Sequence, residues 1–150
     1  MKKMLIIILS VILLVACTAC VKKQKIELPF SANDVKNIEL YRYSVPTSAQ
    51  QKVLTSNDDF TAIIAILTKI DVAKNTLDPV AGSDVTSLRF NLLDGTDFEI
   101  IYISHGVKKG EIMSSYVFDY QTSFDIGSIW SNYGENAKSV TDESLPVYEK

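Results

Sequence analysis

The sequence predicts an α+β fold, in which helices pack on a face of one antiparallel sheet. Residues 35–43 and 98–103 are rich in β-branched and aromatic side chains, and residues 88–92 alternate between apolar and polar side chains. Residues 57–70 instead carry apolar side chains at helical spacing. Strands joined by short turns form antiparallel sheets, and an amphipathic helix buries its apolar side against such a sheet. The predicted architecture is a strand pair plus a three-strand meander, with one main helix and a short C-terminal helix.

The strand pair is predicted at residues 35–43 and 51–55. Pro46, with Ser and Thr residues around it, separates the two segments. Such a cluster ends a strand and starts a turn, so the two strands are expected to be neighbours.

The main helix is predicted at about residues 57–70. Ser56 is a favourable N-cap, and Asp58 and Asp59 lie in the first turn, where the helix dipole favours negative charge. Apolar side chains at spacing i, i+3, i+4 and i+7 form one stripe that we expect to face the sheet, namely Phe60, Ile63, Ile64 and Leu67.

The meander is predicted from residue 88 onwards. A short strand at residues 72–74 and a loop up to residue 84 precede it. Residues 88–92 alternate, residues 98–103 are almost continuously apolar, and Asp94-Gly95 between them is typical of a hairpin turn.

The last part of the domain is predicted as a loop, a strand and a helix. The loop covers residues 105–110, and the third meander strand covers residues 112–120. A short helix at about residues 123–133 follows, opened by Thr122 and Asp125 and carrying apolar side chains at helical spacing.

The first 16 residues are predicted to be a lipoprotein signal peptide. Lys2 and Lys3 precede an apolar run that is too short to cross the roughly 30 Å hydrocarbon core of a membrane. The run ends in Leu14-Val15-Ala16-Cys17, which resembles a bacterial lipobox. This resemblance implies that Cys17 receives a diacylglycerol thioether and that the chain is cleaved between Ala16 and Cys17. The alternative is an uncleaved membrane anchor in which Cys17 is incidental.

A lipid on Cys17 implies that the protein is exported and anchored to the outer face of the cytoplasmic membrane. Outer-membrane sorting is the alternative if the source cell has two membranes, because Thr18 would permit it. Two or three acyl chains anchor stably, whereas a single one holds only marginally. Cys20 is interpreted as a spare thiol near the membrane.

The mature chain is predicted to contain one domain. Residues 17–31 comprise the lipidated Cys and a polar tether, residues 32–134 form the domain, and residues 135–150 form a polar tail. The tether includes three lysines that either contact lipid phosphates or are simply solvated, Lys22, Lys23 and Lys25.

Composition argues against a nucleic-acid partner. Without Lys2 and Lys3 the chain has 13 basic and 18 acidic residues, a formal charge of −5, which gives no electrostatic attraction to phosphate backbones. Both cysteines lie at the membrane end, so no disulfide framework is expected in the domain.

No catalytic, cofactor or metal motif is found in the sequence. His105 is the one histidine and is expected in a loop, without a nucleophile elbow to serve. Asp78 and Asp84 lack the spacing of a calcium loop. We therefore expect no enzyme, no cofactor and no metal.

The arrangement from residue 32 to residue 133 is similar to a family of short, uncharacterised lipoproteins of Firmicutes, in which a strand pair leads into a capped helix and then a meander. The resemblance implies this fold and no particular activity.

Our first hypothesis is a protein- or peptide-interaction module at the cell envelope, including immunity-type sequestration of a cationic peptide. Tyr41 and Tyr43 are candidates for its contact surface, with ordinary packing of the tyrosines as the alternative. The second hypothesis is a small-molecule carrier or sensor with a pocket between the first helix and the sheet.

Overall fold

The computed structural model describes residues 23–77, 82–103, 106–110, 118–134, 136–141, 143 and 145. The strands are β1 (Lys23–Lys25), β2 (Val35–Tyr43), β3 (Gln50–Leu54), β4 (Asp71–Leu77), β5 (Val85–Leu92), β6 (Asp97–Ile103), β7 (Gly106–Gly110), β8 (Phe118–Gln121) and β9 (Lys138–Ser139). The α-helices are α2 (Asn57–Leu67) and α3 (Ile129–Asn132), and the 3-10 turns are η1 (Ala32–Asp34), η2 (Pro46–Ser48) and η3 (Ile126–Ser128).

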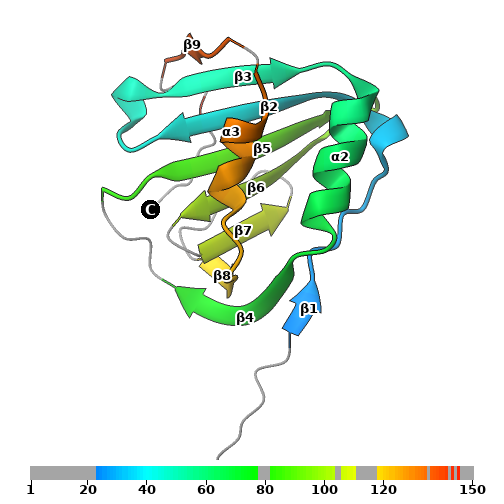
Figure 1. Cartoon of the computed structure of the whole chain (residues 1–150), viewed down its shortest axis with the longest axis vertical. Coiled ribbons are helices and arrows are strands. Elements are labelled where there is room, and N and C mark those ends of the chain that lie inside the picture. The colour runs from blue at the N-terminus through cyan, green and yellow to red at the C-terminus, as the bar shows by residue number, and fades with distance from the viewer. Residues whose placement is uncertain are drawn as a thin grey trace, which may run out of the picture.

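These strands form one open antiparallel sheet in the order β1-β4-β8-β7-β6-β5-β2-β3-β9 (Figure 1). The α+β class is therefore confirmed. Both helices lie on the same face of the sheet (Figure 1). Helix α2 connects β3, near one edge, to β4, near the other, so it carries the chain across this face.

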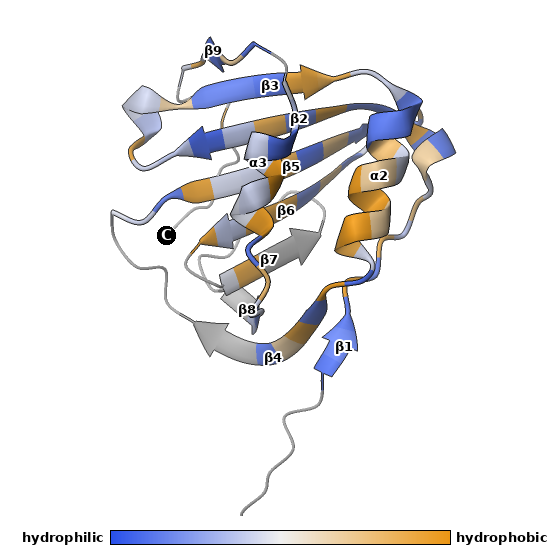
Figure 2. Cartoon of the chain, viewed as in Figure 1, coloured by the Kyte–Doolittle hydropathy of each residue, from blue (hydrophilic) through white to orange (hydrophobic). Residues whose placement is uncertain are grey.

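Helix α2 forms as its capping and periodicity predict, although it ends at Leu67 and not at residue 70. The Ser56 side chain accepts a hydrogen bond from the Asp58 backbone N–H at 3.3 Å. The buried stripe, Phe60, Ile63 and Leu67, is at most 3% exposed and packs on the sheet. Figure 2 shows this apolar side of the helix. The helix ends because Thr68 and Lys69 enter a turn that leads directly into β4.

The β5–β6 hairpin also forms where the sequence predicts it. Gly95 has a φ of 89°, a conformation that glycine adopts without steric cost. The Asp94 carboxylate accepts hydrogen bonds from the backbone N–H and the hydroxyl of Thr96, at 2.9 and 2.7 Å. Local turn chemistry thus fixes the register of the two strands.

Three elements after this hairpin differ from the prediction. The predicted loop at residues 105–110 is wrong at residues 106–110, which form β7 beside β6, with Val107 fully buried. Of the predicted strand at 112–120, residues 112–117 lie outside the described residues, and β8 occupies 118–121. The predicted helix at 123–133 is a 3-10 turn, η3, followed by the four residues of α3.

The predicted tether is also wrong at its C-terminal end, because Lys23–Lys25 already form a strand of the sheet. Strand β1 pairs with β4, and Ile26 is 1% exposed, with its N–H donating to the carbonyl of Ile70 at 3.2 Å. The ring of Phe30 lies 5.1 Å from that of Phe90. The side chains of Ile26, Leu28 and Phe30 recur at every second residue, and all three pack against the main core, so their burial draws this segment into the domain.

The polar tail predicted at residues 135–150 likewise contributes to the fold. Strand β9 pairs with Gln50 and Gln51 of β3, and Leu145 is 5% exposed. Leu145 belongs to a second apolar cluster, on the sheet face opposite the helices. The sheet is therefore covered in part on both faces.

Candidate functional site

The residues predicted to carry function fall into two groups. Ala16 and Cys17, the predicted cleavage and lipidation positions, lie outside the described residues, as does His105. Tyr41 and Tyr43 are described, and they are only 1% and 5% exposed. The predicted contact surface at these tyrosines is therefore wrong: both rings are covered in the second apolar cluster, which also contains Ala49, Val85, Ile101, Ile103 and Leu145.

Beside this cluster, a row of charges crosses three neighbouring strands. Glu39 of β2 is directly opposite Arg89 of β5, and Arg89 is directly opposite Glu99 of β6. Arg89 Nε lies 2.6 Å from Glu99 Oε1, and a guanidinium nitrogen of Arg89 lies 3.5 Å from Glu39 Oε2. The Glu99 side chain is 5% exposed, and burial raises its pKa although the Arg89 charge acts in the opposite direction.

Tyr41 closes this row of charges. Its hydroxyl donates to Glu39 Oε2 at 2.6 Å and accepts from the Gln51 amide at 2.9 Å and from Arg89 at 3.3 Å. Burial, followed by the hydrogen bond to Glu39, raises the pKa of Tyr41. Each polar group of the row is thus hydrogen-bonded or ion-paired to a neighbour in the row. We therefore interpret the row as a structural network and not as a reactive site.

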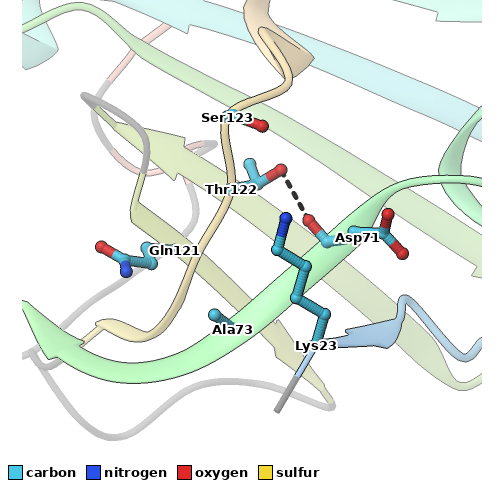
Figure 3. Close-up of a pocket in the computed structure, with 6 residues that line it drawn as sticks. All are labelled: Lys23, Asp71, Ala73, Gln121, Thr122 and Ser123. Atoms are coloured by element: carbon cyan, nitrogen blue, oxygen red, sulfur yellow. Dashed lines mark hydrogen bonds between the residues drawn. The ribbon is translucent and has the colours of Figure 1, made fainter. Parts of the chain in front are cut away.

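One cavity, of about 520 Å³, lies at the β1 edge of the sheet (Figure 3). Its lining is polar apart from one alanine: Lys23, Asp71, Ala73, Gln121, Thr122 and Ser123. The Thr122 hydroxyl donates to the Asp71 carbonyl at 2.9 Å. The amino group of Lys23 points towards this hydrogen bond (Figure 3). Lys25 does not contribute, because its ammonium is held by the Asp71 carboxylate at 2.7 Å and the Lys69 carbonyl at 2.8 Å.

A second cavity, of about 410 Å³, lies between the η3–α3 segment and the sheet. Four separate stretches of the chain line it, and these are the end of β2, the start of β5, the end of β6 and residues 125–132. The lining residues are Arg42, Asp84, Thr86, Tyr102, Asp125, Gly127, Ser128, Ser131 and Asn132.

Sequence reasoning did not identify either cavity as a site. The lining residues come from segments 48 positions apart in the first cavity and 16 to 42 positions apart in the second, so no local spacing pattern links them. The one local signal is the group of polar residues around the predicted C-terminal helix, Asp125, Ser128, Ser131 and Asn132.

Within the ranges that the structure describes, no three His, Cys, Asp or Glu side chains come together as a metal site requires. Asp84, which the sequence places in the unsupported calcium loop, is paired with Arg42 at 3.2 Å. Among the described helices, none is long and apolar enough to cross a membrane.

Comparison with known proteins gives no relative: no family model matches the chain, and no curated protein or solved structure matches it significantly.

Proposed function

We propose that this chain is an exported lipoprotein, anchored through a lipid on Cys17, whose sheet domain binds a protein or peptide at the cell envelope without catalysing a reaction. The lipobox at residues 14–17, directly after an apolar run, supports the anchoring. Strand β1 starts six residues after Cys17. An extended chain spans at most about 3.6 Å per residue, so the anchor would hold the domain within roughly 20 Å of the membrane surface.

The outer edge of β3 is the observation that carries the binding proposal. Strand β9 pairs only with Gln50 and Gln51, so Lys52 to Leu54 have no strand on their outer side in the described chain. The Ala49 carbonyl accepts a hydrogen bond from Val140 on that side. Because backbone groups alternate along a strand, the N–H and C=O of Val53 point outwards as well.

An outward N–H and C=O on an edge strand can pair with an added strand of a partner. The Val53 side chain is 41% exposed, so an arriving peptide would find an apolar contact beside the backbone. The charge of −5 predicted for the mature chain favours a cationic peptide, as immunity-type sequestration would need. This edge replaces the Tyr41 and Tyr43 surface as the place where a partner would bind.

The anchor is tested by metabolic labelling with a palmitate analogue. We expect Cys17→Ser to take up no label and to accumulate as the precursor, whereas the matched variant Cys20→Ser keeps both label and processing. Equal labelling of the Cys17→Ser and wild-type proteins would overturn the anchoring proposal.

The binding edge is tested by crosslinking and pull-down from intact envelopes. Val53→Pro removes the outward N–H without removing a hydrogen bond to β2, so we expect it to lose a partner that wild type captures. The control variant Val53→Thr keeps the N–H and should keep the partner. A partner captured equally by Val53→Pro would place binding elsewhere on the domain.

A cavity favours the second hypothesis, that of a small-molecule carrier or sensor. This cavity lies beside α3, whereas the sequence predicts a pocket beside the first helix, α2. The side of α2 that faces the sheet is packed, with Ile63 and Leu67 fully buried, and the second cavity instead lies against η3 and α3.

A further inference from the structure

The cavity between the η3–α3 segment and the sheet has a buried floor and an exposed rim. Thr86 and Tyr102 form the floor and are 3% and 7% exposed, whereas Ser131 and Asn132 on the rim are exposed. The volume of about 410 Å³ falls within the range of roughly 300–1,000 Å³ that is usual for small-molecule sites. The site therefore has the depth and size to hold a small ligand.

Gly127 allows η3 to lie close against this floor. A Cβ atom at this position would lie 3.0 Å from Asp125 Oδ1 and 3.3 Å from Thr86 Oγ1, closer than most real contacts. The Asp125 carboxylate and the Thr86 hydroxyl therefore both lie close to Gly127, and a larger residue at this position would displace them.

One carboxylate of the lining has no partner among the described residues. Asp84 is paired with Arg42 at 3.2 Å, and the Ser44 hydroxyl and the Arg42 charge lower the pKa of Asp84. No described residue donates a hydrogen bond to the Asp125 carboxylate, although Ser128 donates to the Asp125 backbone carbonyl at 2.7 Å. The lining thus carries a net charge of about −1, which disfavours an anionic ligand.

Every lining side chain except that of Gly127 carries a polar group. An apolar ligand would displace water from the Asp125 carboxylate and the Asn132 amide without replacing its hydrogen bonds, which is costly. The set combines carboxylate acceptors, the Asn132 amide and several hydroxyls that both donate and accept. A ligand with many hydroxyl groups matches this set, since each of its hydroxyls can also donate and accept.

We propose that this cavity binds an uncharged, polyhydroxylated ligand of monosaccharide size, with the Asp125 carboxylate and the Asn132 amide as its main hydrogen-bonding groups. The site depends neither on lipidation of Cys17 nor on the outer edge of β3.

The test is saturation-transfer difference NMR on the full chain, in a detergent with a phosphocholine headgroup so that no sugar is introduced. The probes are glucose and N-acetylglucosamine, with gluconate as the anionic control and methylammonium as the cationic control. Ser131→Phe fills the rim of the cavity, and Ser123→Phe makes the same change at the other cavity, beside Lys23. Both serines are exposed, so neither change is expected to unfold the domain.

We expect at least one of the two sugars to bind wild type and Ser123→Phe equally, and to bind Ser131→Phe at least about tenfold more weakly, a difference of about 1.4 kcal/mol. Asp125→Ala should weaken binding of the same sugar, because no described residue already engages this carboxylate. The proposal is overturned if neither sugar binds, if gluconate or methylammonium binds in place of the sugars, or if Ser123→Phe and Ser131→Phe lose binding equally.

Discussion

Arg89 and Glu99 are directly opposite each other on β5 and β6, and their side chains are joined at 2.6 Å between Nε and Oε1. The Glu99 side chain is 5% exposed and that of Arg89 is 21% exposed. An ionised carboxylate at this depth needs its partner, because burial without one is strongly unfavourable. The pair therefore couples two central strands on the face opposite the helices.

Replacing Arg89 with Met is expected to lower the free energy of unfolding by about 3 kcal/mol. This is the low end of the range for breaking a buried pair, because Arg89 keeps some exposure. Urea unfolding followed by circular dichroism measures the change. The control is Glu39→Gln, which removes a partner at 3.5 Å that is 23% exposed and should cost less than about 1 kcal/mol. Equal losses of unfolding free energy in Arg89→Met and Glu39→Gln would contradict the conclusion that Arg89 depends mainly on its pairing with Glu99.

The raised pKa of Glu99 predicts a specific pH dependence. Its folded-state pKa lies above the ordinary value of 4.5, mainly because of burial, so the folded state holds this proton more tightly than the unfolded state. Its stabilising contribution is fully present below 4.5 and is lost as the pH rises through the folded-state pKa. Wild type should therefore gain stability relative to Glu99→Gln as the pH falls from neutrality towards 4.5.

Urea unfolding of both proteins across this pH range measures that difference. The carboxylates whose pKa is lowered act in the opposite direction, because they lose their stabilising contribution as the pH falls. They are present in both proteins and cancel in the comparison: Asp34, Asp71, Asp84 and Asp94. A stability difference that does not change with pH would show that Glu99 titrates equally in the folded and unfolded states.

Replacing Lys52 with Met is expected to detach α3 from β3. The Lys52 ammonium donates to the carbonyls of Trp130 and Tyr133 at 2.9 and 2.7 Å, and it lies 4.6 Å from the centre of the Trp130 ring. Hydrogen bonds to a charged group contribute about 1.5–3 kcal/mol each, so we expect a loss of at least about 2 kcal/mol.

The chain has one tryptophan, so its fluorescence reports directly on this contact. We expect a shift of the Trp130 emission in Lys52→Met, together with a lower midpoint of thermal unfolding. The exposed Lys36 offers a matched control, since Lys36→Met should change stability by less than about 0.5 kcal/mol. An unchanged emission spectrum in Lys52→Met would show that α3 is held by its apolar contacts alone.

The contribution of residues 23–31 to the fold is tested by Ile26→Ala. Ile26 is 1% exposed within the main core, so its truncation should cost about 3 kcal/mol. The exposed Val45 is the control, and Val45→Ala should be within about 0.5 kcal/mol of wild type. If Ile26→Ala were as stable as Val45→Ala, residues up to 31 would be a tether, as the sequence predicts. Thermal unfolding of both variants decides between these outcomes.

The elements that the sequence predicts well are those defined by neighbouring residues. Helix α2 follows from the Ser56 cap and an apolar stripe within eleven residues, and the β5–β6 hairpin follows from Asp94-Gly95. Strand β2 follows from its β-branched and aromatic composition, and its bounds, Val35–Tyr43, are those predicted. In each case the stabilising interactions are local, so the local sequence is enough to predict them.

The candidate sites could not be predicted in the same way. The sequence identifies Cys17 through a contiguous motif, but it gives no reason to associate Arg42 with Asp125 or Lys23 with Thr122, which become neighbours only through the order of the strands. Tyr41 and Tyr43 are equally suited by type to a contact surface or to a core. Whether the sheet face that carries these tyrosines is covered depends on Leu145, about one hundred residues further along the chain.

The sequence by itself determined the α+β class, the main helix and the hairpin, because capping, turn chemistry and periodicity act between residues a few positions apart. Only the tertiary structure decided that residues 23–25 join the sheet, that Lys52 is buried beneath α3, and that charges form a row across three strands. The physical reason is that strand order and burial depend on contacts between distant segments. Their free energy comes from the apolar surface buried by the whole sheet, and not from any one stretch of the chain.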